Sequence, residues 1–296
     1  MAQIEVLGFG ALNLDYLYQV PEIVLEGETV VESVTVAPGG SAANTCRALA
    51  QWGVRTSFLG AVGDDPDGGA MLAGLRKSGV DVSQVVIKPD APTSRVIGLV
   101  DPHGHRSLYV EPGANDLLNE DDLDLKAIGQ ARLVHLASFA SERQLTLQEW
   151  VVEHLPPQVT VSFSPGQIYA RLGWERLAKI LRRTAILFVN ETEAEWLGGV
   201  ESLRRCGCEI AVETLGARGG RVIHAGGSFR VPGFSTEVVD TTGAGDAFAA
   251  GFLLGWLREK SLETCARWGN WAASCVIREA GANSTLPTVD ELEALA

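Results

Sequence analysis

The residues of this chain best suited to chemistry lie in one short segment, Asp240-Thr241-Thr242-Gly243-Ala244-Gly245-Asp246. It leads into an apolar stretch predicted as a helix, so the N–H groups of Gly243, Ala244 and Gly245 would face outward at the positive helix end. Such a terminus can hold a phosphoryl group in transfer. Asp246 would be a base beside it, able to take a proton from an attacking hydroxyl. The alternative, that Asp246 is a simple helix cap, would not require the glycines before it.

The composition is that of a globular chain and argues against two classes of partner. The 296 residues are 46% hydrophobic and 21% charged, which is ordinary for a globular protein. The formal net charge of −13 argues against nucleic acid and anionic membrane, since both attract basic proteins. Neither a leader peptide nor a transmembrane stretch is apparent, so we expect a cytoplasmic protein. The five cysteines are an odd number and spread widely, unlike a disulfide framework, and the one close pair, Cys206 and Cys208, has no second pair or histidine cluster to complete a zinc site.

The elements that must position the segment alternate between strand and helix. Strands are predicted at 4–9, 56–62, 133–137, 159–163, 186–189, 209–213, 220–224 and 229–231, and helices at 42–52, 68–78, 145–154, 244–256 and 262–277, with another beginning at 191. This alternation predicts an α/β three-layer sandwich, with a mostly parallel central sheet and helices on both faces. Two strand-rich segments, about 14–37 and 94–112, would pair as a small antiparallel β lid. We expect one domain, 1–296, into which the lid segments are inserted.

Two segments resemble the signatures of a known family. The segment Asp240–Asp246 resembles the C-terminal signature of the ribokinase-like (PfkB) carbohydrate kinases, and Pro38-Gly39-Gly40-Ser41-Ala42-Ala43-Asn44 resembles their N-terminal signature. The resemblance covers nearly the whole chain. It implies the ribokinase-like fold and an ATP-dependent kinase that phosphorylates a hydroxyl group of a sugar or sugar-like molecule. The base and the anion hole would be those described above.

The resemblance also implies which residues contact the acceptor. Asn13 and Asp15 match the family's N-x-D element, whose aspartate binds substrate hydroxyls. A carboxylate can accept hydrogen bonds from two neighbouring hydroxyls, which suits a polyol. Gly39 and Gly40 would let the backbone lie against the substrate, and the Asn44 amide would reach it from the next helix. Outside this motif, Asp15 would be interpreted as a turn residue.

A further set matches the nucleotide site of the family. Asn190 would contact phosphate oxygens, and Glu193 would orient the water around Mg²⁺, which retains several waters and needs few protein carboxylates. Thr214 and Gly216 belong to a turn that resembles the family's T-L-G near the nucleotide. Asn270 would line the adenine pocket, although a structural role in a buried helix is an open alternative.

The resemblance further suggests a monovalent cation. Asp240 and Thr242 match positions that help to bind one in many members of the family. Gly281 and Ser284 fall where additional ligands would lie. K⁺ is therefore a hypothesis beside ATP and Mg²⁺.

Several features leave the acceptor open. Ribokinases usually carry a lysine where this chain has Ser41, and a glutamate where it has Ser138. Both differences argue against ribose itself, and they leave a sugar, sugar acid, polyol or nucleoside. Arg106 and His105, in the second lid segment, could reach a substrate phosphate, although a solvated hairpin is the simpler interpretation. The aromatic residues that could contact a nucleoside ring, or equally belong to the core, are Tyr16, Tyr18, Phe139 and Phe163.

Two other functions fit parts of the pattern. Gly8-Phe9-Gly10 suggests a dinucleotide-binding oxidoreductase, but Asn13 stands where the third glycine of G-x-G-x-x-G would be. A non-catalytic sugar- or nucleotide-binding regulator on the same fold would have no chemical need for Asp246. The apolar edges of the lid strands predict a homodimer that forms through the lids.

Overall fold

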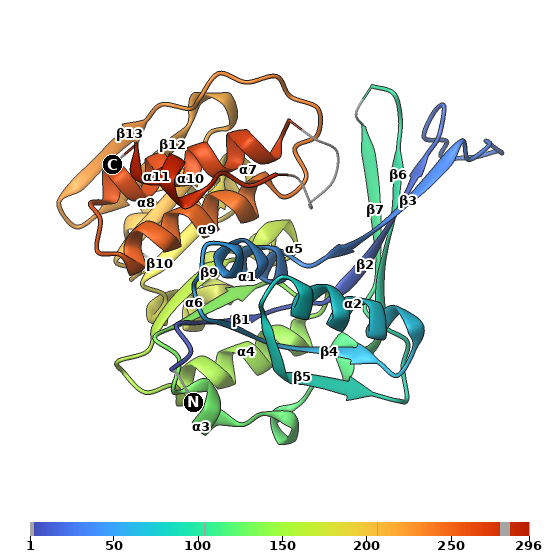
Figure 1. Cartoon of the computed structure of the whole chain (residues 1–296), viewed down its shortest axis with the longest axis horizontal. Helices are drawn as coiled ribbons and strands as arrows, with labels where there is room; N and C mark the ends of the chain where they lie inside the picture. Colours follow the sequence, from blue (N-terminus) through green and yellow to red (C-terminus); the bar gives the residue numbers. More distant parts are fainter. Residues whose placement is uncertain (1–2, 104, 206, 279–284, 296) are drawn as a thin grey trace.

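The computed structural model describes residues 3–103, 105–205, 207–278 and 285–295, which form a nine-stranded sheet and a separate four-stranded sheet (Figure 1). The strands of the large sheet, in spatial order, are β13 (Gly227–Val231), β12 (Gly220–His224), β11 (Ile210–Thr214), β10 (Ile186–Asn190), β9 (Thr160–Ser164), β8 (Leu133–Ala137), β1 (Val6–Phe9), β4 (Thr56–Gly63) and β5 (Asp81–Lys88). All neighbours from β11 to β5 pair in parallel, and β12 and β13 add an antiparallel edge. The predicted, mostly parallel sheet is confirmed.

Helices cover both faces of this sheet, and each face has its own hydrophobic core. On one face lie α1 (Ser41–Gln51), α2 (Pro66–Lys77), α9 (Ala244–Leu257), α10 (Leu262–Val276) and α11 (Val289–Glu293). On the other lie α3 (Leu125–Ile128), α4 (Glu142–His154), α5 (Gly166–Ala170), α6 (Gly173–Arg183), α7 (Glu191–Trp196) and α8 (Gly199–Arg205). The result is the predicted three-layer sandwich. No helix in these described ranges is long and apolar enough to cross a membrane.

Two of the elements that escaped prediction show the physical reason. The strand Asp81–Lys88 is an edge strand of the large sheet, and most of its residues are only partly buried, so its apolar pattern is weak. The helix Gly173–Arg183 is rich in charge and buries only Leu177, Ile180 and Leu181. Its stability therefore depends on docking these three side chains rather than on a continuous apolar run.

The two predicted lid segments form one small sheet that rises from the side of the molecule (Figure 1). Its order is β3 (Ser33–Gly39), β2 (Asn13–Gln19), β6 (Ser94–Val100) and β7 (Arg106–Glu111). The β2–β3 and β6–β7 pairs are antiparallel as predicted, and the central β2–β6 pair is parallel.

The register divides the lid into two faces. Asp15 pairs with Val96, which pairs with Val110, and paired residues point to the same side of a sheet. We call this the inner face; Arg106, four residues before Val110, also lies on it. Tyr16 pairs with Ile97 on the opposite side, the outer face.

The helices α9 and α10 approach closely because small residues line their contact. A Cβ atom placed on Gly251 would lie 2.7 Å from the carbonyl oxygen of Trp268 in α10. That oxygen belongs to the backbone and cannot move without shifting the helix. A side chain at this position would therefore push apart the helix that carries Asp246.

We expect Gly251→Ala to lower the free energy of unfolding by about 1–3 kcal/mol, the usual cost of overpacking. Gly69→Ala is the matched control, because Gly69 lies in α2 with open space around its missing side chain. This control should gain up to about 1 kcal/mol through helix propensity. Urea unfolding of the two variants measures both effects. Equal stability of Gly251→Ala and the parent chain would contradict the packing argument.

Candidate active site

Asp246 lies in the first turn of α9, where its side chain meets the start of α1. The Ser41 hydroxyl donates to Asp246 Oδ1 (2.5 Å), and Asn44 Nδ2 donates to Oδ2 (2.9 Å). The Thr45 hydroxyl donates to the backbone carbonyl of Asp246 (3.3 Å). The two signature segments, about 200 residues apart, therefore form one site.

The surroundings of Asp246 set its acidity. Burial raises its pKa to about 6, and the hydrogen bonds from Ser41 and Asn44 oppose that rise. The N-terminal ends of α1 and α9 both lie at this carboxylate, and their partial positive charges favour its ionised form. The group is therefore ionised near neutral pH yet basic enough to accept a proton.

The loop before α9 has the geometry expected of an anion site. Gly243 is the N-cap residue and has a φ of 77°, which favours glycine. A Cβ atom on Gly245 would meet no atom within 4 Å, so its backbone is open to a ligand. The Ala244 N–H donates to the carbonyl of Thr241 (3.2 Å), so it is engaged within the loop here.

Asp15 projects from β2 toward the same region. Its Oδ1 atom is buried and has no hydrogen-bond partner among the described residues, and a Cβ atom on Gly39 would lie 2.4 Å from its Oδ2. Gly40 has a φ of 106°, and a side chain there would strike the carbonyl of Ala11. Burial, and then the charge of Asp246, raise the pKa of Asp15 to about 6. An unpaired carboxylate oxygen of this kind suits a ligand that donates hydroxyl hydrogens.

Asn13 has a structural role in addition to its predicted one. Its Oδ1 accepts from the Ser94 hydroxyl (2.8 Å) and from Asn115 Nδ2 (3.2 Å), so the oxygen is engaged in joining the two lid segments. Asn115 also bonds both backbone groups of Leu12 (3.2 Å each). Sequence reasoning missed Asn115, whose one signal was its place directly after the turn that ends the second lid segment.

Three residues predicted to contact the nucleotide line one cavity of about 520 Å³. They are Thr214, Gly216 and Asn270, and Gly245 contributes to the same wall. Phe248 adds an apolar surface, which suits a nucleotide base. Asn270 Nδ2 donates to the carbonyls of Val231 and Pro232 (3.2 Å each), so Asn270 both lines the cavity and holds its wall.

Asn190 and Glu193 cap the helix α7. The Asn190 N–H donates to Glu193 Oε2 (3.0 Å), and the Glu193 N–H donates to Asn190 Oδ1 (2.9 Å). The two residues therefore form a capping box at the start of α7. The position also fits the nucleotide prediction, because Asn190 ends β10 directly beside Thr214 of β11. Burial raises the pKa of Glu193, and the charge of Asp246 adds to that rise.

The carboxylates of the site fit a bound Mg²⁺. The charge of Asp246 acts on both Asp15 and Glu193, so a cation among them would relieve mutual repulsion. The described ranges contain no group of three or more His, Cys, Asp or Glu side chains that could hold a metal alone. Mg²⁺ takes most of its ligands from water and phosphate oxygens, so it needs few protein carboxylates.

Of the four residues predicted to bind K⁺, two lie in the part of the chain that the structure describes. Asp240 Oδ1 accepts from the N–H (2.9 Å) and the hydroxyl (2.7 Å) of Thr242, which fixes both side chains. Gly281 and Ser284 lie outside the described residues.

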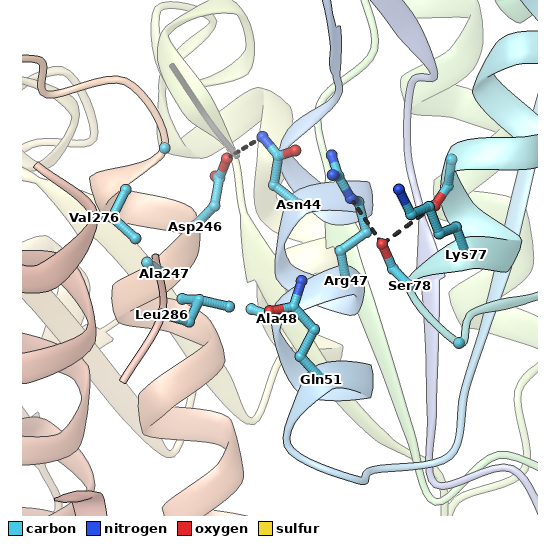
Figure 2. Close-up of a pocket in the computed structure, with 13 residues that line it drawn as sticks. Asn44, Arg47, Ala48, Gln51, Lys77, Ser78, Asp246, Ala247, Val276 and Leu286 are labelled. Atoms are coloured by element: carbon cyan, nitrogen blue, oxygen red, sulfur yellow. Dashed lines mark hydrogen bonds between the residues drawn. The ribbon is translucent and has the colours of Figure 1, made fainter. Parts of the chain in front are cut away.

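Asp246 and Asn44 also line a second cavity, of about 750 Å³ (Figure 2). Figure 2 shows Asp246 on one side and Arg47 and Lys77 across from it. Arg47 donates through Nε to the Ser78 hydroxyl (3.4 Å) at the end of α2. Asp15, the predicted acceptor residue, lies outside the wall of this cavity.

The remaining predicted contacts have mixed outcomes. Phe139 and Phe163 are at most 1% exposed and belong to the core, so they form no acceptor surface. Tyr16 lies on the outer lid face, where its hydroxyl donates to Asp67 Oδ2 (3.2 Å). Arg106 is exposed, as the simpler interpretation of a solvated hairpin expects, and its Nη1 also donates to Thr242 Oγ1 (3.2 Å).

Comparisons with known proteins agree with this geometry. The family described as pfkB family carbohydrate kinase matches residues 3–289. An uncharacterized sugar kinase of Archaeoglobus fulgidus is 37% identical over 81% of this chain and 98% of its own length. An ATP-dependent ribose-1-phosphate kinase of Halopiger xanaduensis is 33% identical over 98% of this chain and 97% of its own.

Among solved structures, an Arabidopsis thaliana ribokinase complexed with ribose and ATP superposes with a TM-score of 0.86. It is 25% identical, and the match covers 100% of this chain and 99% of that one. The match of the family over nearly the whole length, together with the shared fold, shows that this chain belongs to the pfkB family of carbohydrate kinases.

Proposed function

We propose that this chain transfers the γ-phosphoryl group of ATP to a hydroxyl of a sugar or sugar-like acceptor, and that Asp246 takes the hydroxyl proton. The observation that carries this proposal is the Asp246 carboxylate, which lies at the glycine-rich start of α9 and is held by Ser41 and Asn44. A basic group beside a helix terminus that binds anions is what phosphoryl transfer requires.

The chemistry of the step is a direct displacement. Asp246 takes the acceptor proton as the acceptor oxygen forms its bond to the γ-phosphorus. The bond from that phosphorus to the bridging oxygen of ADP breaks, and ADP leaves with the negative charge. Asp15 would orient the acceptor through its unpaired Oδ1. The backbone N–H groups of Gly243 and Gly245, with open space beside Gly245, would stabilise the charge on the transferring group.

We infer two cation requirements from the acidic residues of the site. Glu193 would hold the hydration shell of Mg²⁺, which when bound neutralises phosphate charge. Asp240 and Thr242 would contribute to a K⁺ site next to the anion loop. We further propose a cytoplasmic location, because five widely spread cysteines are unlike the disulfide framework of a secreted domain.

The acceptor class is inferred from Ser41 and Ser138, which stand where ribokinases usually carry a lysine and a ribose-binding glutamate. Ser41 is engaged with Asp246, and Ser138 stands where a glutamate would bind ribose. An acceptor other than free ribose is therefore favoured. The relative named as a ribose-1-phosphate kinase makes phosphorylated sugars a class to test beside sugars, sugar acids, polyols and nucleosides.

We also propose a homodimer that forms through the outer lid faces. The apolar side chains exposed on this face are Val34 (52%), Val36 (48%), Ile97 (41%) and Tyr109 (60%). Val36, Tyr16, Ile97 and Tyr109 are consecutive partners across the four strands. A continuous apolar row of this kind is typical of a buried interface.

An ADP-release screen with MgATP and K⁺ tests the activity directly. The panel should contain free sugars, ribose 1-phosphate, sugar acids, polyols and nucleosides. We expect turnover with one class, and at least about a 100-fold loss of kcat in Asp246→Asn with the affinity for ATP retained. A fully active Asp246→Asn preparation, shown free of parent enzyme, would mean that the base lies elsewhere.

The pH profile tests the surroundings of the base. Asp246 is active when it is deprotonated, so kcat/KM should fall as the pH drops below about 6. Removing the Ser41 hydroxyl removes a bond that favours the charged form, so Ser41→Ala should move this acid limb to higher pH. Ser41→Thr, which keeps the hydroxyl, is the control. An unchanged acid limb in Ser41→Ala would argue against the influence of Ser41 on the base.

Light scattering tests the homodimer. We expect the mass of two chains at micromolar concentration, and the mass of one chain for Ile97→Lys, because a charge would be buried in the interface. Leu25→Lys is the control, since Leu25 is 99% exposed and lies outside the lid strands. A parent chain that is monomeric at this concentration would contradict the proposal.

A further inference from the structure

One arginine of the lid reaches across to the C-terminal signature. Arg106 begins β7 on the inner face, and its Nη1 donates to the hydroxyl oxygen of Thr242 (3.2 Å). Thr242 directly precedes Gly243, the N-cap residue of α9. The contact joins residues 136 positions apart and links the lid to the loop predicted to hold the phosphoryl group.

The charge of Arg106 is not neutralised by the protein around it. Arg106 is exposed, and its guanidinium forms no ion pair with any carboxylate of the described ranges. Arginine has five N–H donors and stays charged throughout the accessible pH range. Most of these donors are therefore available to a ligand.

The other arginine of the lid strands makes a useful contrast. Arg95 lies on the outer face, where it forms an ion pair with Asp67 (2.8 Å) and packs over the ring of Tyr16 (5.7 Å to the ring centre). Arg95, on the outer face, is therefore paired within the protein, whereas Arg106, on the inner face, has no carboxylate partner in the described ranges and lies toward the cleft.

Thr242 fixes where the Arg106 guanidinium lies. The hydroxyl hydrogen of Thr242 is donated to Asp240 Oδ1 (2.7 Å), which leaves an oxygen lone pair directed toward Arg106. The guanidinium is thus held next to the anion loop rather than over the lid strands alone.

We propose that Arg106 is a catalytic residue that contacts the transferring γ-phosphoryl group and neutralises charge on it in the transition state. This inference rests on the proposed function. Charge in phosphoryl transfer spreads over the three equatorial oxygens of the transferring group, and a planar guanidinium can bind two of them. Arg106 neither gains nor loses a proton, and the acceptor proton still goes to Asp246. Because Arg106 comes from the lid, the charge is delivered only where the lid lies over the site.

Steady-state kinetics with MgATP and the best acceptor of the panel test the role. Arg106→Gln should lower kcat on the order of 100- to 1000-fold, with the KM for ATP and for the acceptor within about threefold. Arg106→Lys should keep part of the rate, since it retains charge without the planar fork. Free guanidinium should restore part of the activity of Arg106→Ala. Arg95→Gln is the control and should keep the parental kcat.

Three outcomes would overturn the proposal. An unchanged kcat in Arg106→Gln would show that the transferring group does not need this charge. A raised KM for the acceptor at constant kcat would assign Arg106 to an anionic group of the acceptor instead. Loss of thermal stability in Arg106→Gln, with no rescue of Arg106→Ala by guanidinium, would make the residue structural.

A binding measurement separates this inference from the proposed function. Aluminium fluoride with MgADP mimics a phosphoryl group in transfer and needs no identified acceptor. The parent chain should show a larger rise in Tm with MgADP and aluminium fluoride than with MgADP alone, and Arg106→Gln should lose only the additional rise. The same additional rise in both proteins, or none in the parent, would overturn the role of Arg106. No shift with MgADP at all would contradict the proposed kinase function itself.

Discussion

The partial burial of one carboxylate between the first turns of two helices is the constraint on which the rest of this structure depends. Asp246 loses part of its water there, so its ionised form needs hydrogen-bond donors from the protein. Ser41 and Asn44 supply these donors, so α1 and α9 must begin at the same point in space. This requirement explains the close helix packing at Gly251 and the positive φ at Gly40, since each lets a helix reach its place.

The electrostatics of the cleft explain how an acidic protein can bind a polyanion. The chain carries a net charge of −13, and the charge of Asp246 acts on both Asp15 and Glu193 in the site. Attraction for phosphate must therefore be local. In the proposed mechanism it would come from helix termini, from Arg106 and from bound cations, all of which act over a few ångströms and are screened beyond about 10 Å.

The lid separates two sets of side chains by the simple alternation of a β-strand. Successive side chains point to opposite faces, so Asp15 lies toward the cleft while Tyr16 lies on the outer face with Ile97. A shift of one residue in register would exchange the two sets. The contacts that Asn115 and Ser94 make with Asn13 hold that register where the lid leaves the large sheet.

The sequence by itself determined the sheet type, the longer apolar helices that cover it and the two signature segments, because these follow from local periodicity and from motifs of consecutive residues. Asp246 could be singled out for the same reason. Only the tertiary structure decided that Ser41 bonds Asp246, that Arg106 reaches Thr242, that Asn13 is engaged by Asn115, and that Phe139 is core. These contacts join residues far apart in the chain. The local sequence pattern does not predict these contacts, because they depend on how the packed layers bring loops and helix ends together.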